Sequence, residues 1–429
     1  MLLRFGFSNH RSFRDPVEVS FAASALKDLP HARPSSPAVK HGLLPVMAIY
    51  GANASGKSNV LRALRAMVAH IRSSHTRLEP GAPIPRHPFK LDDEALASPT
   101  RFDCDLLLDG VRYHYGFSFS DVAFEEEWLY AWPNGHKQLW FHRSGADREA
   151  WYFGPSLKGQ RARMAELTRN NSLFLSTAAQ NNHPALGRLY GYFTRSVQLW
   201  DGFPMDAPTM WSESMVHQPE QYARVLALLR QADLGIESFR VEDRQDWIVD
   251  TIEELQGGSS TQELAEQLRE RLSREGSPKQ LVLGHTGAGE RVQWLEPQEE
   301  SDGTHALLNI LHMLLPVLQH GHLLVIDELD RSLHPHLVQA VLSLFTGADS
   351  NPKGAQLLFT THDADTLSVL RRDEVVVVEK SRDGVSQLRP LSDFHARKGD
   401  DLRRNYLDGR YGGVPRLGDF RRALQEGEL

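Results

Sequence analysis

The chain has 429 residues, of which 41% are hydrophobic and 24% are charged, a composition typical of a globular protein with about two to three domains. Its formal net charge of -7 excludes a strong global attraction to nucleic acid, although a local basic groove stays open. The single cysteine, Cys104, excludes an internal disulfide, and no apolar run is long enough to span a membrane. These features predict a cytoplasmic protein without membrane segments.

Two short strands are predicted at the start of the chain, over residues 2–7 and 17–22. The turn between them carries Asn9, Arg11 and Ser12. A loop with several Pro and Gly residues follows and leads to the first motif that carries chemistry.

That motif is GANASGKS, residues 51–58, which fits the phosphate-binding loop pattern G-x-x-x-x-G-K-[ST] at every fixed position. An apolar strand over 45–50 precedes it, and a helix is predicted over 59–74. Gly51 and Gly56 allow the backbone to curl so that its N–H groups point inward around an anion. The positive end of the helix dipole adds to this cradle.

Two side chains of the loop complete the predicted nucleotide site. Lys57 is placed to reach the β- and γ-phosphates, and the Ser58 hydroxyl is placed to ligate Mg²⁺. The alternative is a glycine-rich turn between a strand and a helix, which the flanking pattern disfavours. The residues predicted to bind the nucleotide here are Gly51, Asn53, Ala54, Ser55, Gly56, Lys57, Ser58 and Asn59.

The middle of the chain contains three segments with different residue patterns. Residues 101–132 alternate apolar and polar side chains around an Asp-Gly dipeptide, which predicts an antiparallel sheet, and residues 139–154 add a further strand or hairpin. Residues 160–250 are mostly helical in pattern. The polar stretch 250–275 predicts an amphipathic helix or helix pair, a pattern more typical of a solvated face than of a partner site.

The last third returns to an alternation of helices and strands, which predicts a parallel sheet with the nucleotide at the carboxyl ends of its strands. The predicted order is helix 303–319, strand 322–326, helix 334–346, strand 355–360, helix 363–370 and strand 374–379.

Two of these strands end in groups suited to phosphate hydrolysis. HLLVIDE runs from four apolar residues into Asp327, placed to hold Mg²⁺, and Glu328, placed to polarise an attacking water as general base. QLLFTTH ends in His362, whose imidazole is placed to bond the γ-phosphate or the water. A buried strand ending in ordinary surface acids is the alternative, and the phosphate loop in the same chain disfavours it.

A further candidate is the helix start ESDGTH, residues 300–305. Ser301 or Asp302 is suited to cap the helix, and Gly303 follows. A helix N-terminus with a hydroxyl also binds anions. By sequence physics alone, simple capping and anion binding are equally supported.

The order of these motifs resembles the ATP-binding-cassette ATPase head. More closely, the chain resembles the ABC-type AAA family ATPases of bacterial abortive-infection and anti-phage operons, relatives of overcoming-lysogenisation-defect ATPases and of SMC/RecF-like heads. The resemblance covers nearly the whole chain and rests on FSNHRSF, GANASGKSN, RNNSLFLSTAAQ, ESDGTHALLNIL, LLVIDELDRSLHPHL, FTTHD, VVVVEKSRDGVSQLRPLSDF and YLDGRYGGVP.

The resemblance implies an α/β fold: an ABC-ATPase-type head with a mixed central sheet, an antiparallel β subdomain and a mostly helical insertion. It implies an N-terminal lobe over 1–154, the insertion over 155–275 and a C-terminal lobe over 276–429. Lys57 and Ser58 match the Walker A pair, Asp327 and Glu328 the Walker B pair, and His362 the switch histidine. Ser301 and Gly303 match the signature motif, residues 330–333 fall at the D-loop, and Gln180 is a candidate for the Q-loop.

By the same resemblance, the cofactors are ATP and Mg²⁺. The protein would assemble as a homo-oligomer, a dimer or higher, through ATP-sandwiched heads, with Ser301 of one copy facing the phosphates held by the other. ESDGT lacks the Leu-Ser-Gly-Gly-Gln pattern of transporters, which argues against transport. No nuclease motif is visible, so the predicted role is sensor or scaffold for a separate effector, a nuclease or toxin.

Two other functions stay open at this stage. A DNA-binding repair ATPase of the SMC/RecF kind would have the same fold, but the net charge and the lack of long heptad runs disfavour it. A small-molecule kinase or GTPase switch lacks the guanine-specifying Asn-Lys-x-Asp run and leaves the Ser-Asp-Gly helix start without a role.

Overall fold

The computed structural model describes residues 1–26, 28–35, 39–145, 151–200, 219–243, 279–287, 289, 291–394, 399–415 and 418. The chain divides into two compact units. The first comprises residues 1–202, 316–330 and 338–429, and the second comprises residues 203–315 and 331–337. Helices α10 (Asp302–His320) and α11 (Pro335–Thr346) contribute residues to both units.

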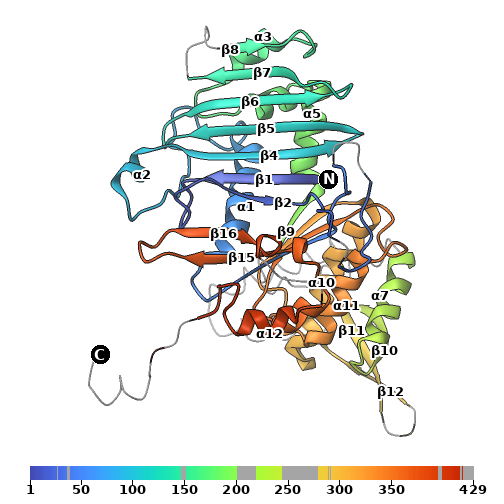
Figure 1. Ribbon diagram of the computed structural model, residues 1–429. Coiled ribbons are helices and arrows are strands. Elements are labelled where there is room, and N and C mark those ends of the chain that lie inside the picture. The colour runs from blue at the N-terminus through green and yellow to red at the C-terminus, as the bar shows by residue number, and fades with distance from the viewer. Residues whose placement is uncertain are drawn as a thin grey trace, which may run out of the picture. The chain divides into compact units, whose positions relative to one another are not determined.

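The first unit contains a seven-stranded antiparallel sheet in the order β2-β1-β4-β5-β6-β7-β8, which Figure 1 shows strand by strand. Alternate residues point inward, and the aromatic rings of Phe102, Phe117 and Phe119 meet on that inner face. The strands are β1 (Leu2–Ser8), β2 (Val17–Ser20), β4 (Thr100–Leu108), β5 (Val111–Phe119), β6 (Phe124–Trp132), β7 (Gln138–Ser144) and β8 (Trp151–Phe153).

The same unit contains a six-stranded mixed sheet in the order β16-β15-β3-β14-β13-β9. Its central strands β3, β13 and β14 are buried along their whole length, as expected for strands covered on both faces. Only β16 runs antiparallel to its neighbour. The strands are β3 (Val46–Gly51), β9 (Val197–Trp200), β13 (Leu323–Ile326), β14 (Gln356–Thr360), β15 (Val375–Lys380) and β16 (Ser386–Pro390).

Helix α1 (Lys57–Ser73) joins the two sheets into one core. Its larger apolar residues recur every three or four positions and are buried from Val60 to Ile71. They share one apolar cluster with residues of both sheets, such as Phe117 of β5 and Leu358 of β14. The helix that begins at the phosphate loop is therefore held in place on both sides.

The shorter helices of the first unit surround these sheets. A buried carboxylate, Glu127, accepts hydrogen bonds from the N–H groups of Phe174 (2.6 Å) and Leu175 (2.9 Å) and from the Tyr115 hydroxyl (3.0 Å). The RNNSLFLSTAAQ segment is thus tied to β6 at the start of its helix. The helices are α2 (Asp93–Ala97), α3 (Arg161–Leu167), α4 (Phe174–Gln180), α5 (Pro184–Gly191), the π-helix η2 (Tyr192–Ser196), η4 (Ala364–Ser368), η5 (Arg372–Glu374), η6 (Leu391–Asp393) and α12 (Leu402–Leu407).

The described part of the second unit holds a three-stranded antiparallel sheet in the order β10-β11-β12, together with one helix before it. Its elements are α7 (Pro219–Gln231), β10 (Ile236–Asp243), β11 (Lys279–Thr286), β12 (Val292–Leu295) and the short η3 (Pro297–Glu299).

The predicted α/β class, with a mixed central sheet and an antiparallel β subdomain, is confirmed. The amphipathic helix or pair over 250–275 lies outside the described residues, and the division at 154 and 275 stays a prediction. The sequence missed β9, which pairs in parallel with β13. The helix expected over 363–370 is instead the short 3-10 helix η4, whose N-cap is Asp363 and which ends at Ser368.

None of the helices in the described part of the chain has the length and apolar character needed to cross a membrane.

Burial of His70 makes the stability of this core sensitive to acid. Its ring lies 4.6 Å from that of Phe119, and burial lowers its pKa from 6.5 to about 4. Between these values the unfolded chain binds the proton and the folded chain does not, so stability present above pH 6.5 is lost as the pH falls toward 4. We expect His70→Met to reduce the loss in unfolding free energy from pH 7 to pH 5 by about 2 kcal/mol. Urea unfolding of both proteins at the two pH values measures this, and an unchanged loss in the variant would contradict it.

Candidate nucleotide site

The phosphate loop follows β3 and has the backbone of an anion cradle. The backbone is left-handed at Ala54 (φ 60°) and Gly56 (φ 117°), and Gly51 has a φ of 154°. A Cβ added at Gly51 would lie 2.5 Å from the Val378 carbonyl oxygen, and one at Gly56 would lie 2.5 Å from the Ser386 hydroxyl. Both positions therefore require glycine for the loop to close this tightly.

Lys57 lies inside this loop and is only 6% exposed. Its ammonium donates to the carbonyl oxygens of Gly51 (2.8 Å) and Ala52 (3.1 Å). Burial lowers the pKa of Lys57, and the carboxylates of Glu328 and Asp327 oppose that shift. The ammonium is thus held at the centre of the loop with acidic groups close by.

The loop contacts the acidic end of β13 through Ser58, whose hydroxyl donates to Asp327 Oδ1 at 2.9 Å. The same carboxylate oxygen accepts a hydrogen bond from the Thr360 hydroxyl at 2.7 Å. Thr360 Oγ1 in turn accepts from the Glu328 N–H at 2.7 Å, and Glu328 has left-handed backbone, with φ 57°. A continuous chain of hydrogen bonds therefore runs from the phosphate loop to the predicted general base.

Strand register explains why these residues meet. Strands β13 and β14 run in parallel, with Ile326 opposite Phe359, so Asp327 and Thr360 follow side by side at the same edge. Strand β14 also pairs in parallel with β3, which delivers the phosphate loop to that edge. The site forms where three carboxyl ends meet, as expected for an open α/β sheet.

His362 lies at this edge as well, two residues beyond Thr360, and is exposed. Its backbone N–H donates to Asp330 Oδ2 at 3.2 Å, which joins the end of β14 to the segment after β13. Its role as switch histidine stays a prediction.

The residues present fit a magnesium ion bound with phosphate. The Ser58 hydroxyl and the Asp327 carboxylate already lie within hydrogen-bond distance, and both are hard oxygen donors of the kind that Mg²⁺ prefers. The Ser55 hydroxyl lies buried in the same loop and has no hydrogen-bond partner in the described part of the chain.

Ser301 and Gly303 belong to the second unit, so only their local geometry is described. Ser301 Oγ accepts from the Thr304 N–H at 3.1 Å, and α10 begins at Asp302. Ser301 is therefore the N-cap. Gln180 lies at the end of α4 and donates to the Tyr190 hydroxyl at 3.2 Å, and its role in a Q-loop stays a prediction.

Thr360 is the functional candidate that sequence reasoning missed. The motif QLLFTTH placed it at the end of a strand but gave it no role. Parallel pairing of the two motif-bearing strands was the signal that would have found it, because it sets Thr360 beside Asp327.

Residues 46–368 match the model of a family described as "AAA domain, putative AbiEii toxin, Type IV TA system". This match spans about three quarters of the chain. The chain belongs to this family of AAA domains. The resemblance to AAA ATPases of the abortive-infection type, predicted from the motifs, is thereby confirmed.

Two further comparisons were made with this AAA domain. No curated protein matches it significantly. Among solved structures, a chain in the "Crystal structure of the SmcHead bound to the C-winged helix domain of ScpA" is 12% identical, with a TM-score of 0.41, over 90% of this chain and 96% of that chain.

We expect Thr360→Val to lower the rate of ATP hydrolysis about tenfold. The isosteric change removes the hydroxyl that fixes both Asp327 and the backbone of Glu328. Steady-state hydrolysis measures the effect, with Thr76→Val, a change at an exposed threonine after the end of α1, as the control. Equal rates in the two variants would contradict the assigned role.

Proposed function

We propose that this AAA domain binds and hydrolyses ATP with Mg²⁺. The observation that carries the proposal is the hydrogen-bonded chain from Ser58 through Asp327 and Thr360 to Glu328, beside the buried ammonium of Lys57. Lysine, serine and two consecutive carboxylates in this order are the groups that phosphoryl transfer to water requires.

Each group has one task in this proposal. Lys57 leaves its carbonyl partners and pairs with the β- and γ-phosphate oxygens, while loop N–H groups hold the β-phosphate. Ser58 and Asp327 would hold Mg²⁺, which would neutralise charge on the phosphate oxygens. Glu328 takes a proton from the water that attacks the γ-phosphorus, and its left-handed backbone, held by Thr360, fixes its direction.

We further propose that two copies close head to head over two ATP molecules. The capped start of α10 offers the Ser301 hydroxyl and the first-turn N–H groups, which together suit the γ-phosphate of the opposite copy. Such an interface is isologous, as expected for a twofold dimer. ATP binding then brings the two copies together and ATP hydrolysis separates them. The bound nucleotide thus shifts the equilibrium between monomer and dimer.

In this proposal the assembled form acts as sensor or scaffold for a separate effector in anti-phage defence. The family description, with its reference to a toxin of a type IV toxin–antitoxin system, supports a role of this kind. The effector would be a separate protein, a nuclease or toxin, and its release or retention would follow the nucleotide state.

Mixing two inactive variants tests the shared site. Lys57→Ala removes the phosphate ligand of one copy, and Ser301→Arg blocks the contact offered by the other. A mixed dimer contains one site with native Lys57 and native Ser301. We expect the mixture to recover up to about a quarter of native hydrolysis, because random pairing gives about half mixed dimers with one of two sites intact. Activity of the mixture no higher than that of either variant alone would contradict the sandwich.

A further inference from the structure

The C-terminal segment over residues 399–415 belongs to the first unit and has no part in the chemistry above. It consists of α12 and the turn that follows, and its sequence from Tyr406 to Pro415 is YLDGRYGGVP. Tyr406 lies near the end of α12 and is only 6% exposed. Its hydroxyl donates to the Gly413 carbonyl oxygen at 3.1 Å, which closes the turn onto the helix.

This C-terminal segment packs directly on Gly51, the first glycine of the phosphate loop. A Cβ added at Gly413 would lie 3.3 Å from Gly51 Cα and 2.5 Å from Val377 Cγ1, so the turn has no room for a side chain there. The Tyr406 ring meets the ring of Tyr50 edge to face, with centres 5.4 Å apart. Burial raises the pKa of the Tyr406 hydroxyl, and a hydrogen bond from the Gly51 N–H opposes that shift. Tyr406 and Gly413 therefore hold Gly51 from outside the loop.

The segment is itself anchored at two points, so it can act as a fixed support. On α12, Arg403 Nε lies 2.7 Å from Asp365 Oδ1 of η4. In the turn, the Gly413 N–H donates to Glu379 Oε1 of β15 at 3.4 Å. Both partners belong to the first unit, as the phosphate loop does.

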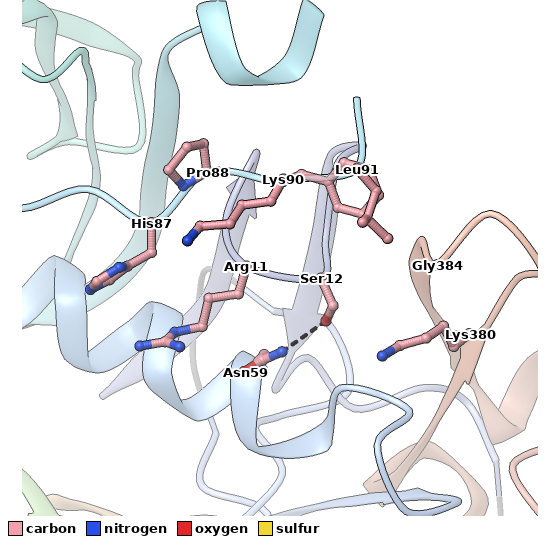
Figure 2. Close-up of a pocket in the computed structure, with 10 residues that line it drawn as sticks. Arg11, Ser12, Asn59, His87, Pro88, Lys90, Leu91, Lys380 and Gly384 are labelled. Carbon is pink, nitrogen blue, oxygen red and sulfur yellow. Dashed lines mark hydrogen bonds between the residues drawn. The ribbon is translucent and has the colours of Figure 1, made fainter. Parts of the chain in front are cut away.

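The other end of the phosphate loop is also held from outside. Ser386, the first residue of β16, donates to the Ser55 carbonyl oxygen at 2.5 Å. Asn59, in the first turn of α1, donates to Ser12 Oγ at 2.8 Å, as Figure 2 shows. The loop thus has support from β16 and the β1–β2 turn at one end and from the C-terminal segment at the other.

Support at Gly51 matters most when a nucleotide binds. In the structure, the Lys57 ammonium donates to the carbonyl oxygens of Gly51 and Ala52 and so ties the loop to itself. In the proposed function, Lys57 exchanges these two bonds for phosphate oxygens, and the loop loses that internal tie. A loop that keeps its conformation during this exchange binds phosphate with a smaller ordering cost.

We propose that Tyr406 is a positioning residue for ATP binding, which holds Gly51 in place while Lys57 turns to the phosphates. The inference rests on the function proposed above and extends it to the C-terminal segment. Tyr406 acts through the backbone of Gly51 and touches no reacting atom. Its loss is therefore expected to change ATP affinity and to spare the chemical step.

Two tyrosine-to-phenylalanine changes in the same segment test this assignment. We expect Tyr406→Phe to weaken binding of ATP with Mg²⁺ about tenfold and to raise KM to a similar extent, because the hydroxyl that holds the loop is lost. At saturating ATP, kcat is expected to stay within about twofold. Tyr411→Phe is the matched control. Tyr411 is 5% exposed, and its hydroxyl accepts from Asn405 Nδ2 at 3.1 Å within the segment. Its ATP affinity should stay within about twofold of native.

Isothermal titration calorimetry measures affinity, steady-state hydrolysis separates KM from kcat, and thermal unfolding compares the stability of the two variants. We expect similar shifts in unfolding temperature, because each variant loses one buried hydroxyl. A role in folding alone would then give both variants the same ATP affinity.

A second pair of variants reaches the same contact without changing a tyrosine. Gly413→Ala adds the Cβ that would displace the turn from Gly51 and Val377, so we expect it to weaken ATP binding about tenfold as well. Gly399→Ala is its control, because Gly399 is also left-handed, with φ 97°, but an added Cβ there would have nothing within 4 Å. It should bind ATP like the native protein.

The outcomes separate this inference from the proposed function. Equal ATP affinity of Tyr406→Phe and Tyr411→Phe would overturn the positioning role, and so would a fall in kcat with unchanged affinity. If Lys57→Ala binds ATP like the native protein, the loop is not the phosphate site. The proposed function then fails, and the role of Tyr406 fails with it.

Discussion

Replacing Glu328 by glutamine is expected to lower the turnover number for ATP by a factor of about a hundred to ten thousand. Glutamine keeps the size of the side chain and the backbone N–H bond to Thr360, but it cannot accept a proton from water. ATP affinity is expected to stay within about twofold, because the groups that hold phosphate are unchanged. Hydrolysis in single-turnover and steady-state assays, together with titration of ATP, measures both quantities.

Glu166→Gln is the matched control for this experiment, since Glu166 is an exposed glutamate on α3. It should hydrolyse ATP like the native protein. Turnover of the Glu328→Gln variant near that of the control would remove Glu328 from the role of general base. A loss of ATP binding in that variant would instead indicate that Glu328 shapes the loop.

Lys57→Ala is expected to weaken ATP binding about a hundredfold, because it removes the ammonium that would pair with two phosphate groups. The folded protein is not expected to lose stability to a similar degree. Burial already disfavours the charged form of this lysine, and within the described residues its ammonium donates to the carbonyl oxygens of Gly51 and Ala52 alone.

Titration of ATP into the variant measures its affinity, and urea unfolding measures its stability. Lys57→Met keeps the length of the apolar stem without the charge and serves as the control for packing. Both variants should bind ATP equally poorly. Native affinity in either of them would contradict the placement of the triphosphate in this loop.

The sequence predicted where the motifs of the candidate site lie on the strands. The phosphate loop, Asp327, Glu328 and His362 each occupy one strand end, and apolar runs predicted β3, β13 and β14 to within about two residues. Each of these motifs depends on a short stretch of sequence alone, because it consists of a strand and the residues that directly follow its carboxyl end. Parallel pairing of β3, β14 and β13 then places the three motifs at the same edge of the sheet.

Features that depend on contacts distant in sequence escaped prediction. Strand β9 has four residues and directly follows helical turns, so no period of its own marks it as a strand. The link from Thr360 to Glu328 spans 32 residues and depends on register. The β1–β2 turn is joined to the loops around α2 by hydrogen bonds from Asn9 to residues 80 to 90 positions away, which no spacing rule predicts.

The molecular mass of the Glu328→Gln protein in solution, with and without ATP and Mg²⁺, tests the central claim most directly. Slow hydrolysis preserves bound ATP, so we expect the mass to rise from one chain of 48.4 kDa to twice that value when ATP is added, and the Ser301→Arg change in the same background to prevent the rise. A mass that is the same with and without saturating ATP would contradict nucleotide-driven closure of two copies.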